Sequence, residues 1–192
     1  MTRGIARLIS LTTALALMLT IGAIAPAAAA DAPVTRANGA EKYALKLLNC
    51  TRTGGWVKAD GTCLGRFSGK YSGKRKPLRL HKKISNKASW PWARTITVAK
   101  ACEHGLSGKP DLVQRMRTAG ATYWRYGENI GCGGGAPKWL VLATHRMMQA
   151  EKSYNGGHWK NMKNGAFKSV GIGVATSGST TMVVYDFYGR LY

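Results

Sequence analysis

Two histidines and two glutamates in the second half of the chain are the residues whose types could do chemistry together. They are His104, Glu128, Glu151 and His158. Imidazole and carboxylate groups bind divalent metal ions and transfer protons near neutral pH. Taken one at a time, each also has a plain structural explanation, such as a solvated charge at a helix end. A joint role therefore depends on whether the elements between them bring the four side chains together.

Helix signals in the first half of the chain lead up to His104. Apolar spacing predicts a first helix over residues 41–49. Pro91 suits the first turn of a further helix that runs to about Cys102, which ends just before His104. Two shorter helical patterns cover residues 80–88 and 111–118.

The strongest helical signal positions the second histidine and glutamate. Pro137 opens this helix, and Asn155-Gly156-Gly157 ends it, so that Glu151 lies near its end and His158 just beyond. One face is predicted to carry Leu140, Thr144, Met147 and Glu151. His145 lies about 120° around the helix from Glu151 and is predicted to be a helix-surface histidine.

The end of the chain has the pattern of a β-hairpin. Residues 170–175 and 180–188 alternate around the turn at residues 177–179. Residues 105–126 are predicted to be irregular outside their short helix, and the glycines of 131–135 predict a loop.

The first 30 residues are predicted to be a secretory signal peptide. Arg3 and Arg7 precede an apolar stretch from Leu8 to Ile24, and the alanines that end at Ala30 suit a cleavage site. No later run is apolar enough for an anchor. The protein is therefore expected to be secreted, extracellular and without a transmembrane segment after removal of this peptide.

The remaining chain is predicted to be one domain with a large positive charge. Its 162 residues hold 27 Lys and Arg against 8 Asp and Glu, a formal charge of +19. We expect a flexible lead-in at 31–39, then a single domain over 40–192 with an exposed basic loop at 53–77. Such a charge draws a protein to anionic cell-envelope polymers, acidic lipids or nucleic acid, although a soluble protein with a charged surface is the plain alternative.

All four cysteines follow the predicted signal peptide, as expected for disulfides in an oxidising compartment. Of three pairings, Cys50 with Cys63 and Cys102 with Cys132 are preferred, because they close a short turn-rich loop and tie the His104 segment to the Glu128 segment. A zinc site built from Cys102, His104 and Cys132 is the alternative, although no Cys-x-x-Cys pair supports it.

The order of these motifs resembles the CAP superfamily, which contains SCP domains, cysteine-rich secretory proteins, antigen 5 and plant pathogenesis-related proteins. The resemblance covers roughly residues 40–192, and Leu47-Leu48-Asn49 with Arg52 looks like the opening helix of bacterial members. It is carried by a histidine after a helix and by four motifs: Gly127-Glu128-Asn129-Ile130, Met148-Gln149-Ala150-Glu151, Gly157-His158-Trp159 and Gly171-Ile172-Gly173-Val174.

The resemblance implies an α+β fold, an α-β-α sandwich with a small antiparallel sheet between helical layers. It also implies a cavity lined by a tetrad of His104, Glu128, Glu151 and His158. By similarity, His104 and His158 would bind zinc or another divalent cation. The glutamates would orient the imidazoles or hold a metal-bound water.

Three functional classes then fit the sequence. The favoured one is a secreted, non-enzymatic and monomeric binding protein, whose cavity or groove takes a lipid, sterol or peptide and whose charge brings it to an anionic envelope polymer or membrane. The second is a zinc-dependent, protease-like hydrolase with Glu128 or Glu151 as base. The third is a basic adhesin or toxin-like protein that acts by surface charge.

Binding is favoured over catalysis by what the site lacks. Catalytic zinc usually has three protein ligands, and the chain has neither a His-Glu-x-x-His motif nor a recognisable nucleophile setting. A specific nucleic-acid function is not expected.

Overall fold

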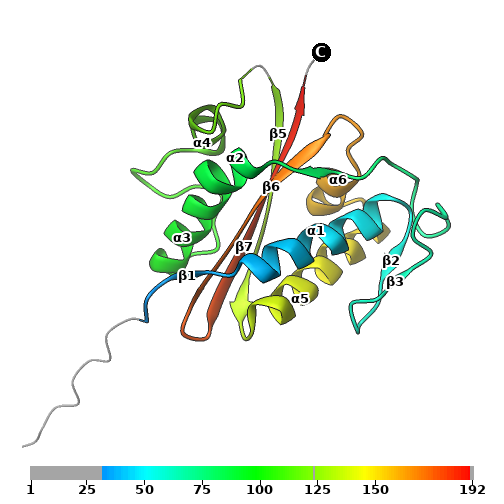
Figure 1. Cartoon of the computed structure of the whole chain (residues 1–192), viewed down its shortest axis with the longest axis horizontal. Helices are drawn as coiled ribbons and strands as arrows, with labels where there is room; N and C mark the ends of the chain where they lie inside the picture. The colour runs from blue at the N-terminus through cyan, green and yellow to red at the C-terminus, as the bar shows by residue number, and fades with distance from the viewer. Residues whose placement is uncertain (1–31, 123, 191–192) are drawn as a thin grey trace, which may run out of the picture. The chain divides into compact units, whose positions relative to one another are not determined.

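An antiparallel sheet runs through the middle of the domain, in a computed structural model that describes residues 32–122 and 124–190 (Figure 1). Its strands follow the order β1 (Thr35–Arg36), β6 (Ser169–Ser177), β7 (Thr180–Arg190) and β5 (Trp124–Gly134). The short β4 (Arg79–Leu80) pairs with β6 in parallel. The predicted signal peptide at 1–30 lies outside the described residues.

Helices cover both faces of this sheet (Figure 1). One layer contains α1 (Asn38–Arg52), α5 (Pro137–Ala150) and α6 (Gly157–Lys163). The other contains α2 (Lys82–Ile84), a π-helical turn η1 (Ser85–Ser89), α3 (Trp90–Ala99) and α4 (Leu112–Thr118). The predicted α-β-α sandwich is confirmed. No helix among the described residues is long and apolar enough to cross a bilayer.

Alternation along β7 divides the core between the two layers. Val183, Tyr185 and Phe187 pack in a cluster with α1 and α5, whereas Met182 and Val184 pack with α3. Asp186 takes the position that follows Val184 on the α3 side, because successive strand residues point to opposite faces. The predicted hairpin thus buries both of its faces, and one of them carries an acidic residue.

The glycine-rich segment at 131–135 is mostly strand, so the predicted loop is wrong. Residues up to Gly134 pair with β7, and only Gly135 leaves the ladder, with a φ of 101°. A Cβ at Gly131 would overlap the Thr144 side chain. These glycines therefore allow α5 to pack closely against β5.

The predicted flexible lead-in at 31–39 is also ordered in part. Residues Thr35–Arg36 add a strand to β6, and α1 begins at Asn38. The Arg36 Nε lies 2.8 Å from a carboxylate oxygen of Glu41, which ties the strand to the helix behind it.

The basic segment at 53–77 is anchored rather than wholly exposed. Its strands β2 (Trp56–Val57) and β3 (Cys63–Leu64) form a small separate sheet. The Val57 backbone is bonded in both directions by Gln149 of α5, which donates to its carbonyl oxygen at 3.1 Å and accepts from its N–H at 2.9 Å.

Both preferred disulfides, Cys50–Cys63 and Cys102–Cys132, are confirmed. The alternative cysteine-containing zinc site is wrong, because its two sulfurs are bonded to each other.

Candidate functional site

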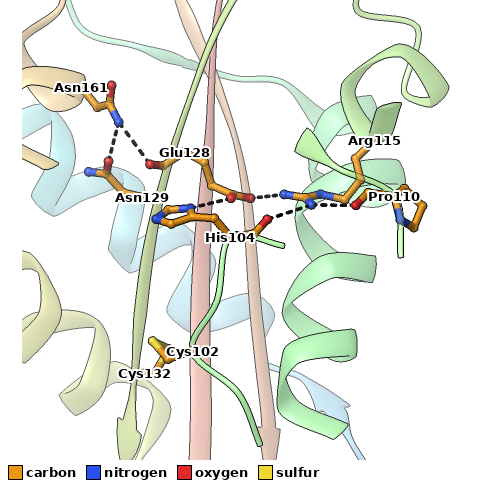
Figure 2. A network of polar contacts seen from close by, with 8 residues as sticks. All are labelled: Cys102, His104, Pro110, Arg115, Glu128, Asn129, Cys132 and Asn161. Atoms are coloured by element: carbon orange, nitrogen blue, oxygen red, sulfur yellow. Dashed lines mark hydrogen bonds and ion pairs between the residues drawn. A yellow bond between two sulfur atoms is a disulfide. The ribbon is translucent and has the colours of Figure 1, made fainter. Parts of the chain in front are cut away.

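The first predicted pair, His104 and Glu128, is formed between a loop and strand β5 (Figure 2). The Nδ1 atom of His104 lies 2.8 Å from Glu128 Oε1. The Cys102–Cys132 disulfide ties the histidine loop to the same strand. The glutamate side chain is only 2 % exposed, while that of His104 is 62 % exposed. The pair therefore presents an imidazole to solvent from a buried carboxylate.

Arg115 of α4 supplies the positive charge that this buried carboxylate needs. Its guanidinium forms an ion pair with Glu128 Oε2 and donates to the carbonyl oxygen of Pro110 at 3.1 Å (Figure 2). It also lies 4.0 Å from the centre of the Trp92 ring. A hydrogen bond to Glu128 raises the pKa of His104, against an opposing effect of burial.

The second predicted pair, Glu151 and His158, lies between α5 and α6. Glu151 begins the 3-10 turn η2 (Glu151–Tyr154), and its Oε1 lies 2.5 Å from His158 Nδ1. Its other oxygen accepts the backbone N–H groups of His158 at 2.9 Å and Trp159 at 3.3 Å. A Cβ at Gly156 would run into this carboxylate, which explains the glycine there.

Two asparagines connect the pairs across β5. Asn161 of α6 donates its amide to the Glu128 carbonyl oxygen at 3.1 Å and to Asn129 Oδ1 at 2.8 Å (Figure 2). Asn129 in turn donates to the His158 carbonyl oxygen at 3.1 Å. The backbones of both pairs are thus held in one polar network.

In both histidines the glutamate carboxylate contacts Nδ1, which fixes the tautomer of the neutral ring. An ionised carboxylate only accepts hydrogen bonds, so Nδ1 of His104 and of His158 must donate. In the neutral imidazole, Nε2 then carries the lone pair, which is the arrangement typical of a metal-binding histidine. No three His, Cys, Asp or Glu side chains gather as a metal site within the described ranges. A metal bound here would have to be held through the Nε2 atoms of His104 and His158.

Comparison with known proteins shows the family to which the chain belongs. Residues 73–187 match the model of the CAP family, described as the cysteine-rich secretory protein family. The chain belongs to the CAP family. The matched range contains all four tetrad residues. No curated protein matches significantly.

One solved structure shares the CAP fold. It is an extracellular protein containing a SCP domain from Bacillus anthracis str. Ames, with a TM-score of 0.53 and 16 % sequence identity. The match covers 80 % of this chain and 41 % of the other, so the chain spans about two fifths of that protein's length.

Sequence reasoning missed Asp186, which lies directly across the strands from Glu128. Its side chain is fully buried beside the Ser89 hydroxyl and the Glu128 carboxylate. Burial, followed by the nearby charge of Glu128, raises the pKa of Asp186 well above its usual value. The sequence did contain a signal that could have identified it, because Asp186 is an acidic residue at an inward-facing position of the predicted strand.

Replacing Asp186 by Asn is expected to stabilise the CAP domain at alkaline pH. With a raised folded pKa, the folded state binds more protons than the unfolded state, so stability falls as pH rises from the unfolded toward the folded pKa. Asparagine does not ionise, so the variant avoids this loss of stability while its side chain keeps the volume of aspartate. We expect a gain of roughly 2–4 °C in melting temperature at about pH 8, and a flatter pH profile, by calorimetry. An equal loss of stability at all pH values would contradict this.

His145 is not a surface histidine, so that prediction is wrong. It is 1 % exposed, and its Nε2 lies 2.9 Å from the Thr51 hydroxyl of α1. Leu140, Thr144 and Glu151 of the predicted face are buried, but Met147 is 52 % exposed and Met148 is buried in its place. The reason is that α5 packs against both α1 and the sheet, so that its buried surface is wider than one stripe.

Proposed function

We propose that this CAP domain is a secreted, non-enzymatic binding protein that uses its tetrad to hold a divalent metal ion and its positive charge to reach an anionic envelope. The observation that carries the proposal is the Nδ1 contact of each tetrad histidine with a carboxylate, at 2.8 Å for His104 and 2.5 Å for His158.

His104 and His158 would be the metal ligands, with zinc as the first candidate. When bound, such an ion would attract an anionic or carbonyl group of a ligand. Glu128 and Glu151 would orient the imidazoles and fix the tautomer that leaves Nε2 for the metal, as carboxylates behind metal-binding histidines do.

The contacts of both glutamates favour binding over hydrolysis. Glu128 is engaged by His104 and Arg115, and Glu151 by His158 and two backbone N–H groups. A general base needs an oxygen within reach of the water it activates. Carboxylates with these partners are better suited to holding the histidines than to taking a proton.

Secretion is supported by the leader-like first 30 residues and by two disulfides, which persist in oxidising compartments. The formal charge of the whole chain is +21, which attracts anionic lipids and polymers over distances set by the salt concentration.

Zinc titration by calorimetry on the purified, disulfide-bonded protein tests the tetrad. We expect one zinc per chain, with affinity reduced roughly tenfold or more in His104→Ala/His158→Ala, since both proposed ligands are lost. The matched control is His81→Asn, which removes a histidine outside the tetrad and keeps a side chain suited to cap α2.

Unchanged zinc binding in the double variant would refute the metal site. Zinc-dependent peptide hydrolysis that is lost in Glu151→Gln would instead establish the hydrolase. If the double variant loses zinc and keeps salt-sensitive binding to anionic vesicles, charge acts separately from the tetrad.

A further inference from the structure

A basic groove lies where residues 74–81 pass the loop that precedes β6. Its volume is about 960 Å³, which is large enough for a small organic ligand. It is lined by Arg52, Lys74, Arg75, Lys76, Arg79 and Lys168, together with His81 and apolar residues, and by no acidic residue. The tetrad residues are not part of it.

The deepest cation of the groove, Arg52, has no acidic partner among residues 32–122 and 124–190. Arg52 is 1 % exposed, and its guanidinium donates only to carbonyl oxygens. These belong to Met162 at 2.7 Å, Phe167 at 2.7 Å, Lys76 at 2.8 Å and Asn164 at 3.0 Å. Burial, and then the charge of Arg75, lowers the pKa of Arg52 to about 10. A buried charge without a counterion is costly, so this end of the groove is electrostatically unbalanced.

Lys163 adds to the same imbalance beside the groove. Its ammonium donates to neutral acceptors, among them the carbonyl oxygens of Arg52 at 3.0 Å and Thr51 at 3.1 Å and the Ser72 hydroxyl at 3.0 Å. Its pKa is lowered to about 8 by burial and by Arg52, Arg75 and Lys152. An anion placed among these groups would relieve their mutual repulsion.

Apolar residues complete the lining. Leu78 and Phe167 are buried beneath the groove, while Pro77 and Leu80 are exposed along it. A simple inorganic anion gains nothing from such a wall. A ligand with an anionic head and a hydrocarbon part would bury apolar surface there and place its charge among the cations.

We propose that the groove is a second binding site of this protein, for the phosphate head group of an anionic membrane phospholipid. The phosphate contacts Arg75, Arg79 and Lys168, and the first acyl carbons lie along Leu80 and Pro77. Arginine suits phosphate because it donates two parallel hydrogen bonds. The proposal deepens the anionic-envelope part of the proposed function and rests on it, and it is independent of the tetrad.

Calorimetric titration with soluble dihexanoyl phosphatidylglycerol, below its micelle concentration and near physiological salt, tests the groove. We expect saturable binding of one molecule, weakened roughly tenfold or more in Arg75→Gln/Arg79→Gln/Lys168→Gln, because charge-assisted contacts to phosphate are lost. The matched control is Lys42→Gln/Lys46→Gln/Lys138→Gln, which removes the same charge from exposed lysines of α1 and α5 outside the groove. This control is expected to retain the affinity.

Two further ligands distinguish the contribution of the head group to the affinity from that of the acyl chains. Glycerol 3-phosphate is expected to bind at least roughly tenfold more weakly, since it lacks the apolar part. Dihexanoyl phosphatidylcholine is also expected to bind more weakly, because its choline is repelled by the cations.

Equal losses of affinity in both triple variants would overturn the groove as the binding site and leave only attraction by the general positive charge. Equal affinity for glycerol 3-phosphate, or tighter binding of soluble polyphosphate, would overturn the phospholipid. None of these outcomes depends on zinc binding, so failure of the groove is distinguishable from failure of the tetrad.

Discussion

Replacing Arg115 by Met is expected to lower the free energy of unfolding by about 3–5 kcal/mol, the usual cost of breaking a buried ion pair from one side. The arginine side chain is 5 % exposed, and that of its partner Glu128 is 2 % exposed. Its loss would leave Glu128, which lies beside the buried Asp186, without its ion pair to Arg115. It would also remove the guanidinium from the face of Trp92.

Urea unfolding of the variant, monitored by tryptophan fluorescence, measures this effect. The matched control is Arg117→Met, on the exposed face of the same helix, which is expected to change stability by less than about 0.5 kcal/mol. Adding Glu128→Gln to Arg115→Met should restore part of the loss, because no uncompensated charge then remains between the layers. A loss no larger than that of Arg117→Met would show that the ion pair adds nothing to stability.

The fold was predicted from the resemblance of the motifs to the CAP superfamily, while local patterns predicted several of its elements. The helix from Pro137, the final hairpin and both disulfides are confirmed, because proline at a helix start, strand alternation and cysteine spacing each act over a few residues. The sequence also drew attention to both histidine and glutamate pairs, through motifs that lie next to glycines. Gly127, for example, leaves room for the Asn161 side chain, because a Cβ at Gly127 would crowd it.

What the sequence could not predict depends on contacts between distant segments. Arg115 looks like an ordinary surface arginine of a short helix until α4 is placed beside β5. The burial of His145 depends on the packing of α1 against α5, which the periodicity of α5 alone does not define. The strand formed by glycines 131–134 depends on its partner β7, which overrides a composition typical of loops.

The buried His145 is expected to make the protein sensitive to acid. Burial lowers the pKa of His145 from 6.5 to about 3. The Thr51 hydroxyl donates to Gln149 Oε1 at 2.8 Å and accepts from His145 Nε2, so Nε2 carries the hydrogen of the neutral imidazole. Between these two pKa values the unfolded chain binds a proton that the folded chain does not, and stability falls as pH falls.

Comparison with His145→Gln isolates this effect, because glutamine can donate to Thr51 and does not titrate. At pH 7 the wild type is expected to be the more stable protein. Between the unfolded pKa of 6.5 and about pH 4.5, the wild type should lose about 2 kcal/mol relative to the variant, with a slope that approaches about 1.4 kcal/mol per pH unit. Urea unfolding at each pH measures the difference, in which the titration of His104 and the carboxylates cancels. Imidazole NMR gives an independent readout, since His145 should remain neutral throughout this range. A His145 that titrates near 6.5, or parallel pH profiles for the two proteins, would show that the buried site accepts the charged form after all.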